Sequence, residues 1–127
     1  MPVALRALLA LLVLALSLSA VWAVDNFAPV ETPAAVSATT TTASTSFTLT
    51  AAINAPDVKV CNTGSTLAYW SCGNSSVQAT VPGAGSTSTP LGAGLCGAYH
   101  KGSGATTCAA ITSSGTTTVT FTAGAGQ

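Results

Sequence analysis

The stretch DVKVCNTGST, residues 57–66, decides the expected fold. Within it Val58 and Val60 alternate with more polar residues, and Asn62 opens the segment N-T-G-S. An apolar residue at every second position is the pattern of a strand with one buried face. Asn, Gly and Ser are typical of turns, so the stretch predicts a strand followed by a tight reversal.

Outward from this stretch, similar short runs rich in Val, Thr and aromatic residues recur, each ended by Gly, Pro, Asn or Ser. The expected strands cover residues 47–51, 57–61, 67–71, 77–81, 95–99, 106–112 and 116–122. About seven strands with hairpin-like connections predict an all-β fold, a small antiparallel β-sandwich or barrel.

The N-terminal part differs in composition from this β-domain, which we expect over residues 47–127. Residues 1–23 hold one positive charge, an apolar run and small residues in the order typical of a secretory signal peptide. An uncleaved, helical membrane anchor is the alternative, because the run is about as long as the shortest membrane spans. Residues 24–46, rich in Pro, Thr, Ser and Ala, predict a flexible arm. The alternative is that Phe27 and Val30 dock on a neighbour and order the arm.

Charged residues are scarce. They make up 5% of the 127 residues, three basic and three acidic, against about 25% in a typical soluble domain. Nucleic-acid binding needs clustered Lys and Arg, which this chain lacks. So few carboxylates and histidines also speak against an enzyme that uses acid–base chemistry. The near-neutral surface and the few large apolar residues favour a chain stabilised by cross-links and by packing in many copies.

The four cysteines, Cys61, Cys72, Cys96 and Cys108, predict two disulfides, because their number is even and a signal peptide is expected. Spacing favours Cys96–Cys108 across a hairpin, which leaves Cys61–Cys72. The alternative is Cys61–Cys108 with Cys72–Cys96. The gaps between the cysteines fit no zinc module, so neither a metal nor another cofactor is expected.

Two aromatic residues and a lone histidine are the remaining candidates. Tyr69 and Trp70 are adjacent in an expected strand, so their rings point to opposite faces. We expect one in the core and the other at the surface, where it could contact another subunit or stack on a sugar ring. His100 is expected as a solvated turn residue. A catalytic set would need Asp57, since it is the one acidic residue after position 31.

The C-terminal part of the chain also carries a resemblance. The segments DVKVCNTGST, SSVQATVP, TPLGAG and CAAITSSGTTTVTFTAGAG follow one another in this order. Over residues 57–127 the chain resembles small β-rich structural proteins of tailed-bacteriophage virions, in which an N-T-G turn follows the first strand and G-x-G ends the last. The resemblance implies a non-enzymatic virion component of the decoration, fibre-base or tail-associated type, with other virion subunits as partners. The alternative is a secreted or surface-attached module that binds a glycan or a cell surface.

Overall fold

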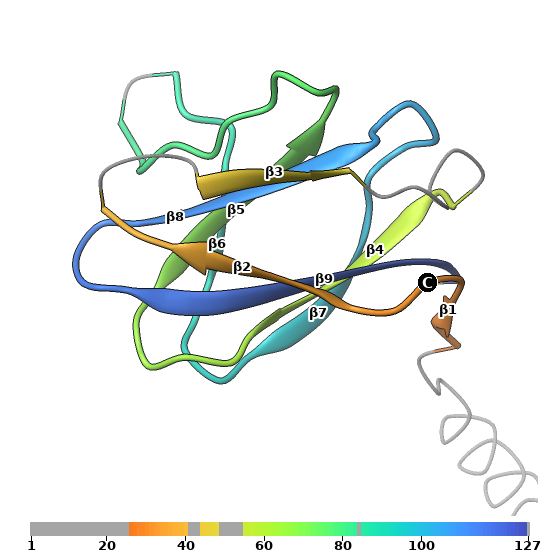
Figure 1. Cartoon of the computed structure of the whole chain (residues 1–127), viewed down its shortest axis with the longest axis horizontal. Helices are drawn as coiled ribbons and strands as arrows, with labels where there is room; N and C mark the ends of the chain where they lie inside the picture. The colour runs from red at the N-terminus through yellow and green to blue at the C-terminus, as the bar shows by residue number, and fades with distance from the viewer. Residues whose placement is uncertain (1–25, 41–43, 49–54, 84, 127) are drawn as a thin grey trace, which may run out of the picture.

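A computed structural model describes residues 26–40, 44–48, 55–83 and 85–126 (Figure 1). These residues form strands and no helix. The strands are β1 (Ala28–Pro29), β2 (Ala34–Ala38), β3 (Ser44–Thr48), β4 (Asp57–Asn62), β5 (Ala68–Gly73), β6 (Thr89–Leu91), β7 (Cys96–His100), β8 (Thr107–Thr112) and β9 (Thr117–Ala125). The signal peptide or anchor expected over residues 1–23 lies outside the described part.

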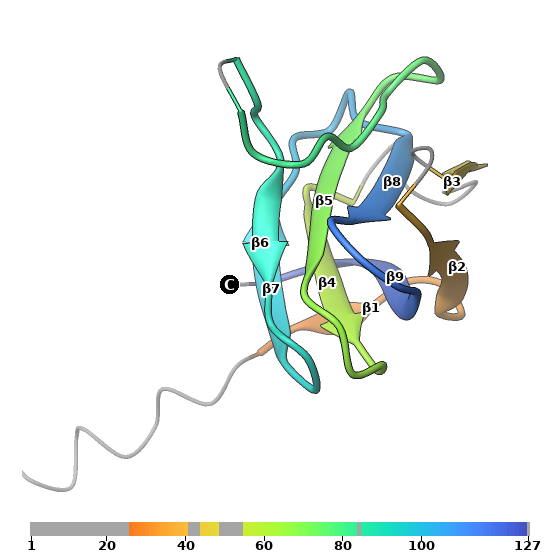
Figure 2. The ribbon, with the colours of Figure 1, turned by 90° about the vertical axis from the view of Figure 1, so that its left-hand side faces the viewer.

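The strands form two antiparallel sheets that pack face to face (Figure 2). In the first sheet the order is β1-β9-β4-β7, and β2 pairs with the same edge of β9 as β1 does. In the second sheet the order is β3-β8-β5-β6. The all-β class is therefore confirmed, and the fold is the sandwich rather than the barrel.

The strand pairs follow one rule: β2 pairs with β9, β3 with β8, β4 with β7 and β5 with β6. The chain is thus a long antiparallel ribbon of paired strands that reverses direction between β5 and β6. This ribbon is rolled up, so that β4 also pairs with β9 and β5 also pairs with β8. A double sheet of eight strands in this order is a jelly roll. Most connections therefore cross between the sheets, and the expectation of hairpins between successive strands is wrong except at β5–β6.

The core lies between the sheets and is built mainly from small side chains. Val58 and Val60 of β4 point inward and are fully buried, as their alternation predicts. Phe121 of β9 and Trp70 of β5 are the large residues, with ring centroids 6.2 Å apart. Alanines and threonines fill much of the remaining interior, so cross-links must supply part of the stability that a larger core would give.

Residues 34–38 belong to the sandwich, so the expectation of a flexible arm does not hold for them. β2 pairs with β9 from Ala34 opposite Phe121 to Ala38 opposite Thr117. The side chains of Val36 and Ala38 are buried. Backbone pairing with a neighbouring strand orders a segment whose composition, taken alone, is typical of a linker.

Residues 77–81 form part of an irregular loop rather than the expected strand. The N–H of Thr80 donates to Ser88 Oγ at 2.8 Å, and Ala79 is buried. Both edges of β5 are already paired, one with β8 and the other with β6. No position in the second sheet is left beside β5 for another strand.

The sandwich has two distinct ends (Figure 1). The loops 63–67, 92–95 and 113–116, which follow β4, β6 and β8, lie at one end. β1 and the end of β9 lie at the other.

Candidate functional site

The four cysteines form two disulfides, as the sequence predicts, but the pairing differs from both expected arrangements. Cys61 of β4 is bonded to Cys96 of β7, with 4.0 Å between the Cα atoms. Cys72 of β5 is bonded to Cys108 of β8, with a Cα separation of 4.1 Å. Cys61–Cys72 and Cys96–Cys108 do not form because β4 and β5 lie in different sheets, as do β7 and β8. The alternative, Cys61–Cys108 with Cys72–Cys96, would join the two sheets, whereas each observed bond joins adjacent strands of one sheet. Cysteines that are close in the sequence are therefore not neighbours across strands.

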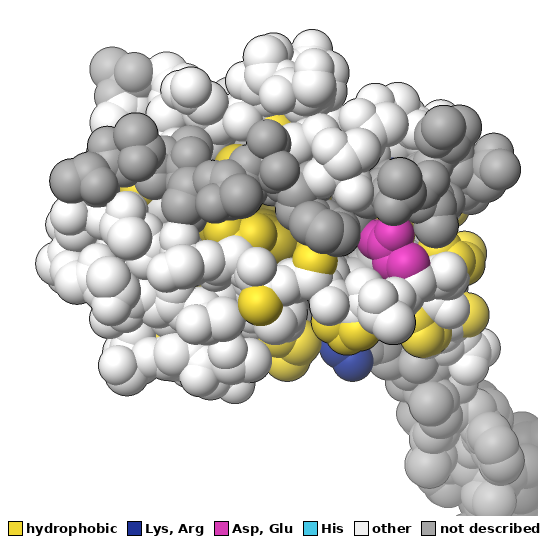
Figure 3. Space-filling model, viewed as in Figure 1, with side chains coloured by type: hydrophobic (Ala, Val, Ile, Leu, Met, Phe, Trp, Pro, Cys, Tyr) yellow, Lys and Arg dark blue, Asp and Glu magenta, His cyan; other side chains and the backbone are white. Residues whose placement is uncertain are grey.

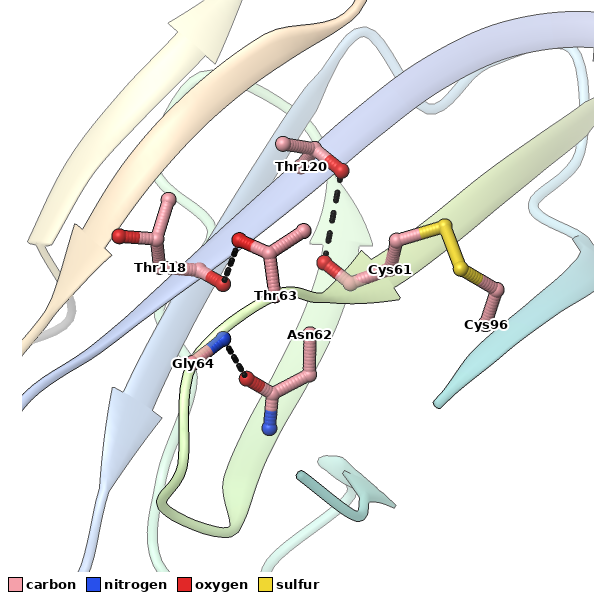
Figure 4. The surroundings of a disulfide bond; sticks show 7 residues. All are labelled: Cys61, Asn62, Thr63, Gly64, Cys96, Thr118 and Thr120. Atoms are coloured by element: carbon pink, nitrogen blue, oxygen red, sulfur yellow. Dashed lines mark hydrogen bonds between the residues drawn. A yellow bond between two sulfur atoms is a disulfide. The ribbon is translucent and has the colours of Figure 1, made fainter. Parts of the chain in front are cut away.

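The two disulfides have different surroundings. Cys61–Cys96 lies on the outer face of the first sheet, where Cys96 is exposed (Figure 4). Cys72–Cys108 faces the interior, where Cys108 is fully buried and Cys72 packs against the core. Two disulfides are compatible with an exported or extracellular protein.

Asn62, which follows Cys61 at the end of β4, joins three segments at the end of the sandwich that carries the loops 63–67, 92–95 and 113–116. Its Nδ2 donates to the carbonyl oxygens of Thr66 at 2.7 Å and Leu91 at 3.1 Å. Its Oδ1 accepts from the Gly64 N–H at 3.2 Å and from Thr117 Oγ1 at 2.6 Å (Figure 4 shows the bond from Gly64). The side chain is 1% exposed and uses both ends of its amide, so its role here is structural.

Gly64 is required by the same arrangement. A Cβ atom at this position would overlap the hydroxyl of Thr117. The N-T-G turn is thus a close contact between the β4–β5 loop and the start of β9, which Thr63 extends by donating to Thr118 O at 3.2 Å.

Asp57 and His100 lie opposite each other on β4 and β7, with Asp57 Oδ1 3.0 Å from His100 Nδ1. The Asp57 side chain is 8% exposed, whereas that of His100 is 70% exposed. Asp57 Oδ2 also accepts the N–H of Gly126 at 2.9 Å. Among the described residues, His100 makes no further side-chain hydrogen bond, so no hydroxyl is aligned on its ring. The carboxylate ties β4, β7 and the C-terminal end of the described chain together.

Lys101, directly after β7, turns its ammonium group back onto the chain. Its Nζ donates to Ala105 O at 2.8 Å and to Gly102 O at 3.3 Å. Burial lowers the pKa of Lys101 below its ordinary value of 10.5, although the nearby charges of Glu31 and Asp57 act in the opposite direction.

The charged residues of the described chain are confined to the first sheet and its flanking segments. They are Glu31, Asp57, Lys59 and Lys101. In Figure 3 the magenta and dark blue side chains lie in the right-hand half of the view, and the other described side chains visible there are uncharged. The second sheet and the described part of its β5–β6 loop contain no charged residue.

The outer face of the second sheet carries Tyr69. Its neighbours across the strands are Pro90 of β6 and Ile111 of β8. Tyr69 is half-buried, whereas Trp70 is 5% exposed and packs against Tyr99 with ring centroids 4.8 Å apart. Of the two aromatic candidates, Tyr69 is therefore the one that a partner could contact.

A shallow groove of about 320 Å³ lies on the outer face of the first sheet. Its lining comprises Phe27, Pro29, Pro33, Lys59, Cys61, Thr120 and Thr122. The Phe27 ring occupies the space that a side chain at position 124 would need, and Gly126, with φ 101°, passes close to Asn26 O. The two glycines of the terminal G-A-G therefore let the N-terminal segment lie against the end of β9.

Within the described residues, no group of three or more His, Cys, Asp or Glu side chains could hold a metal ion. The same residues include no helix long and apolar enough to cross a membrane. No protein family, curated protein or solved structure matches this chain.

Proposed function

We propose that this protein is a non-enzymatic structural component of a phage particle, on whose surface it packs in many copies. The observation that carries the proposal is the uncharged second sheet, whose outer face presents Tyr69, Pro90 and Ile111. Charged residues are depleted in the buried centre of protein interfaces, and aromatic residues are enriched there. A surface without charge also lacks the repulsion that keeps copies of a protein apart.

Two further observations support the proposal. Jelly rolls are common in viral capsid proteins, although they are also found in lectins. The two disulfides and the hydrogen bonds of Asn62 stabilise a small domain, as a protein that must remain folded outside a cell requires. The phage particle itself is suggested by the resemblance over residues 57–127.

The test is the assembly state of the exported, disulfide-bonded chain, measured by sedimentation from micromolar to millimolar concentration. We expect association that Tyr69→Lys weakens, because it places a charge at the centre of the uncharged face. Ser37→Lys, on the outer face of the first sheet, is the matched control and should have little effect. A protein that stays monomeric and highly soluble from micromolar to millimolar concentration, and that binds no partner, would contradict the proposal. Mass spectrometry of purified particles would test the phage assignment separately.

The second candidate is a secreted or surface-attached module that binds a glycan. The groove beside Phe27 and the accessible Tyr69 favour it, because aromatic rings stack on sugar rings. Glycan-array binding that Phe27→Ala or Tyr69→Ala abolishes, with the circular dichroism spectrum unchanged, would establish this function. An array without any binding would argue against it.

A further inference from the structure

The outer edge of β7 has no partner strand among the described residues, since β7 pairs only with β4. The N–H of Asn62 donates to Leu95 O and the N–H of Lys101 donates to Pro56 O, both at 2.9 Å. In an antiparallel pair these bonds occur at every second residue. Gly97 and Tyr99 therefore direct their backbone groups toward β4. The N–H and C=O groups of the alternate residues point away from the sheet; these residues are Cys96, Ala98 and His100.

This edge lacks the features that usually prevent strand addition, namely proline, charge, a bulge or very short length. β7 has five residues, none of them proline, lysine or an acid, and its register with β4 is regular. The β6 edge of the second sheet is three residues long and contains Pro90, and β1 contains Pro29. On the opposite side of the sandwich, β2 lies beside β3, whose pairing with β8 is irregular.

The β7 edge is also held in place by a disulfide and a side-chain hydrogen bond to β4. The Cys61–Cys96 disulfide joins the first residue of β7 to β4, and the contact between His100 and Asp57 joins the last. A strand fixed at both ends loses little conformational freedom when it binds, so less of the binding free energy is offset.

We infer that the β7 edge binds the β7 edge of a second copy of this chain, in antiparallel orientation about a two-fold axis through Ala98. The outward-pointing positions are symmetric about Ala98, so the rotation brings Ala98 opposite Ala98 and Cys96 opposite His100 of the partner subunit. Each such pair can form both of its backbone hydrogen bonds. No lysine or acidic residue of β7 opposes this contact. Among the described residues, Leu95 is the most exposed large apolar side chain, at 58%, and it directly precedes this edge.

Such a contact is closed, because a two-fold axis uses the same surface on both copies. It joins the first sheets of two molecules into one continuous sheet and leaves the uncharged second sheets free. The inference rests on the proposed function as a multi-copy component and specifies one contact between its copies.

The first test compares two lysine variants of the exported, oxidised chain. In Ala98→Lys the added side chains meet at the axis, and we expect the dimer Kd to rise roughly tenfold or more, because like charges are juxtaposed. Ala35→Lys adds the same charge on the outer face of β2, at the other side of the first sheet, and should leave the Kd unchanged. Sedimentation equilibrium measures both.

The second test needs no substitution. Residue-resolved amide exchange on the unaltered chain should show the N–H groups of Cys96, Ala98 and His100 protected in the dimer and exchanging freely after dilution. Those of Gly97 and Tyr99, which point toward β4, should be protected in both states.

The outcomes separate this inference from the proposed function. Association that persists in Ala98→Lys, with the Ala98 amide exchanging freely, overturns the β7 contact and leaves multi-copy packing intact. Disruption by Ala35→Lys alone places the contact at β2 and also overturns it. A larger assembly in which a different protein protects the β7 amides shows strand addition by another partner and contradicts a second copy. A monomer at every concentration contradicts both proposals.

Discussion

At the scale of single residues, Asn62 shows what the sequence can reveal about this site and what it cannot. The run N-T-G-S predicts a turn, and a turn follows β4. The buried role of Asn62 depends on Leu91 and Thr117, which are distant in the sequence. Only the rolled arrangement of the strands brings these partners together, so local spacing carried no signal for it.

Asn62→Ala should lower the free energy of unfolding by about 3 kcal/mol, because it leaves buried partners without hydrogen bonds. Thr63→Ala is the matched control: it removes an exposed hydrogen bond from the same turn and should cost less than about 1 kcal/mol. Urea unfolding measures both variants. Equal losses would show that the buried amide network contributes no more than the exposed bond.

Lys101 should make stability depend on alkaline pH. Because burial lowers its pKa, the folded protein releases this proton at a lower pH than the unfolded chain, whose lysine keeps the ordinary value of 10.5. Between these two values the unfolded chain binds more protons, so the contribution of Lys101 to stability rises with pH. Urea unfolding from neutral pH to 10.5 should show this rise in the wild type and in Lys59→Met, but not in Lys101→Met. Parallel profiles for all three proteins would refute the assignment.

At the scale of strands, alternation in the sequence located β4, β5, β7, β8 and β9. It missed β2, whose small residues resemble a linker, and β6, and it assigned a strand to residues 77–81. The strand expected at residues 47–51 overlaps β3 at residues 47–48, and residues 49–51 lie outside the described part. Alternation reports which side chains can face a core, whereas the strand that pairs with each segment depends on contacts far away in the sequence. The expected disulfide pairing is wrong for the same reason, because proximity in the sequence does not determine which strands are neighbours.

The two disulfides allow a matched comparison of an interior and a surface cross-link. They span 35 and 36 residues, so each should contribute about 4 kcal/mol by constraining the unfolded chain. Replacing Cys72 and Cys108 by alanine should cost about 1–2 kcal/mol more than replacing Cys61 and Cys96, because it also leaves space in the core. Thermal and urea unfolding of the two double variants test this. A greater loss of stability for the Cys61/Cys96 variant would contradict the expectation that the space left in the core adds to the cost.

At the scale of the whole molecule, the separation of charges makes a prediction about assembly. The charged residues of the described chain lie in the first sheet or in the segments that flank it, so association through the outer face of the second sheet should involve little Coulomb attraction. We expect the association constant to change less than about threefold when salt is raised from low to physiological concentration. Sedimentation of the Ala98→Lys variant at two ionic strengths measures it, because this variant lacks the β7 contact. A steep decrease with salt would place the remaining contact on the charged side of the sandwich.

The meeting of Asn26 and Phe27 with Gly124 and Gly126 has a practical consequence. A circularly permuted gene could join residue 126 to residue 26 through a short glycine linker and open the chain in the exposed 113–115 turn. Every strand pair and both sulfur bridges would be retained. Cargo joined at residue 26 or at residue 126 would project from the same end of the sandwich, which leaves the three loops at the opposite end available for engineered display.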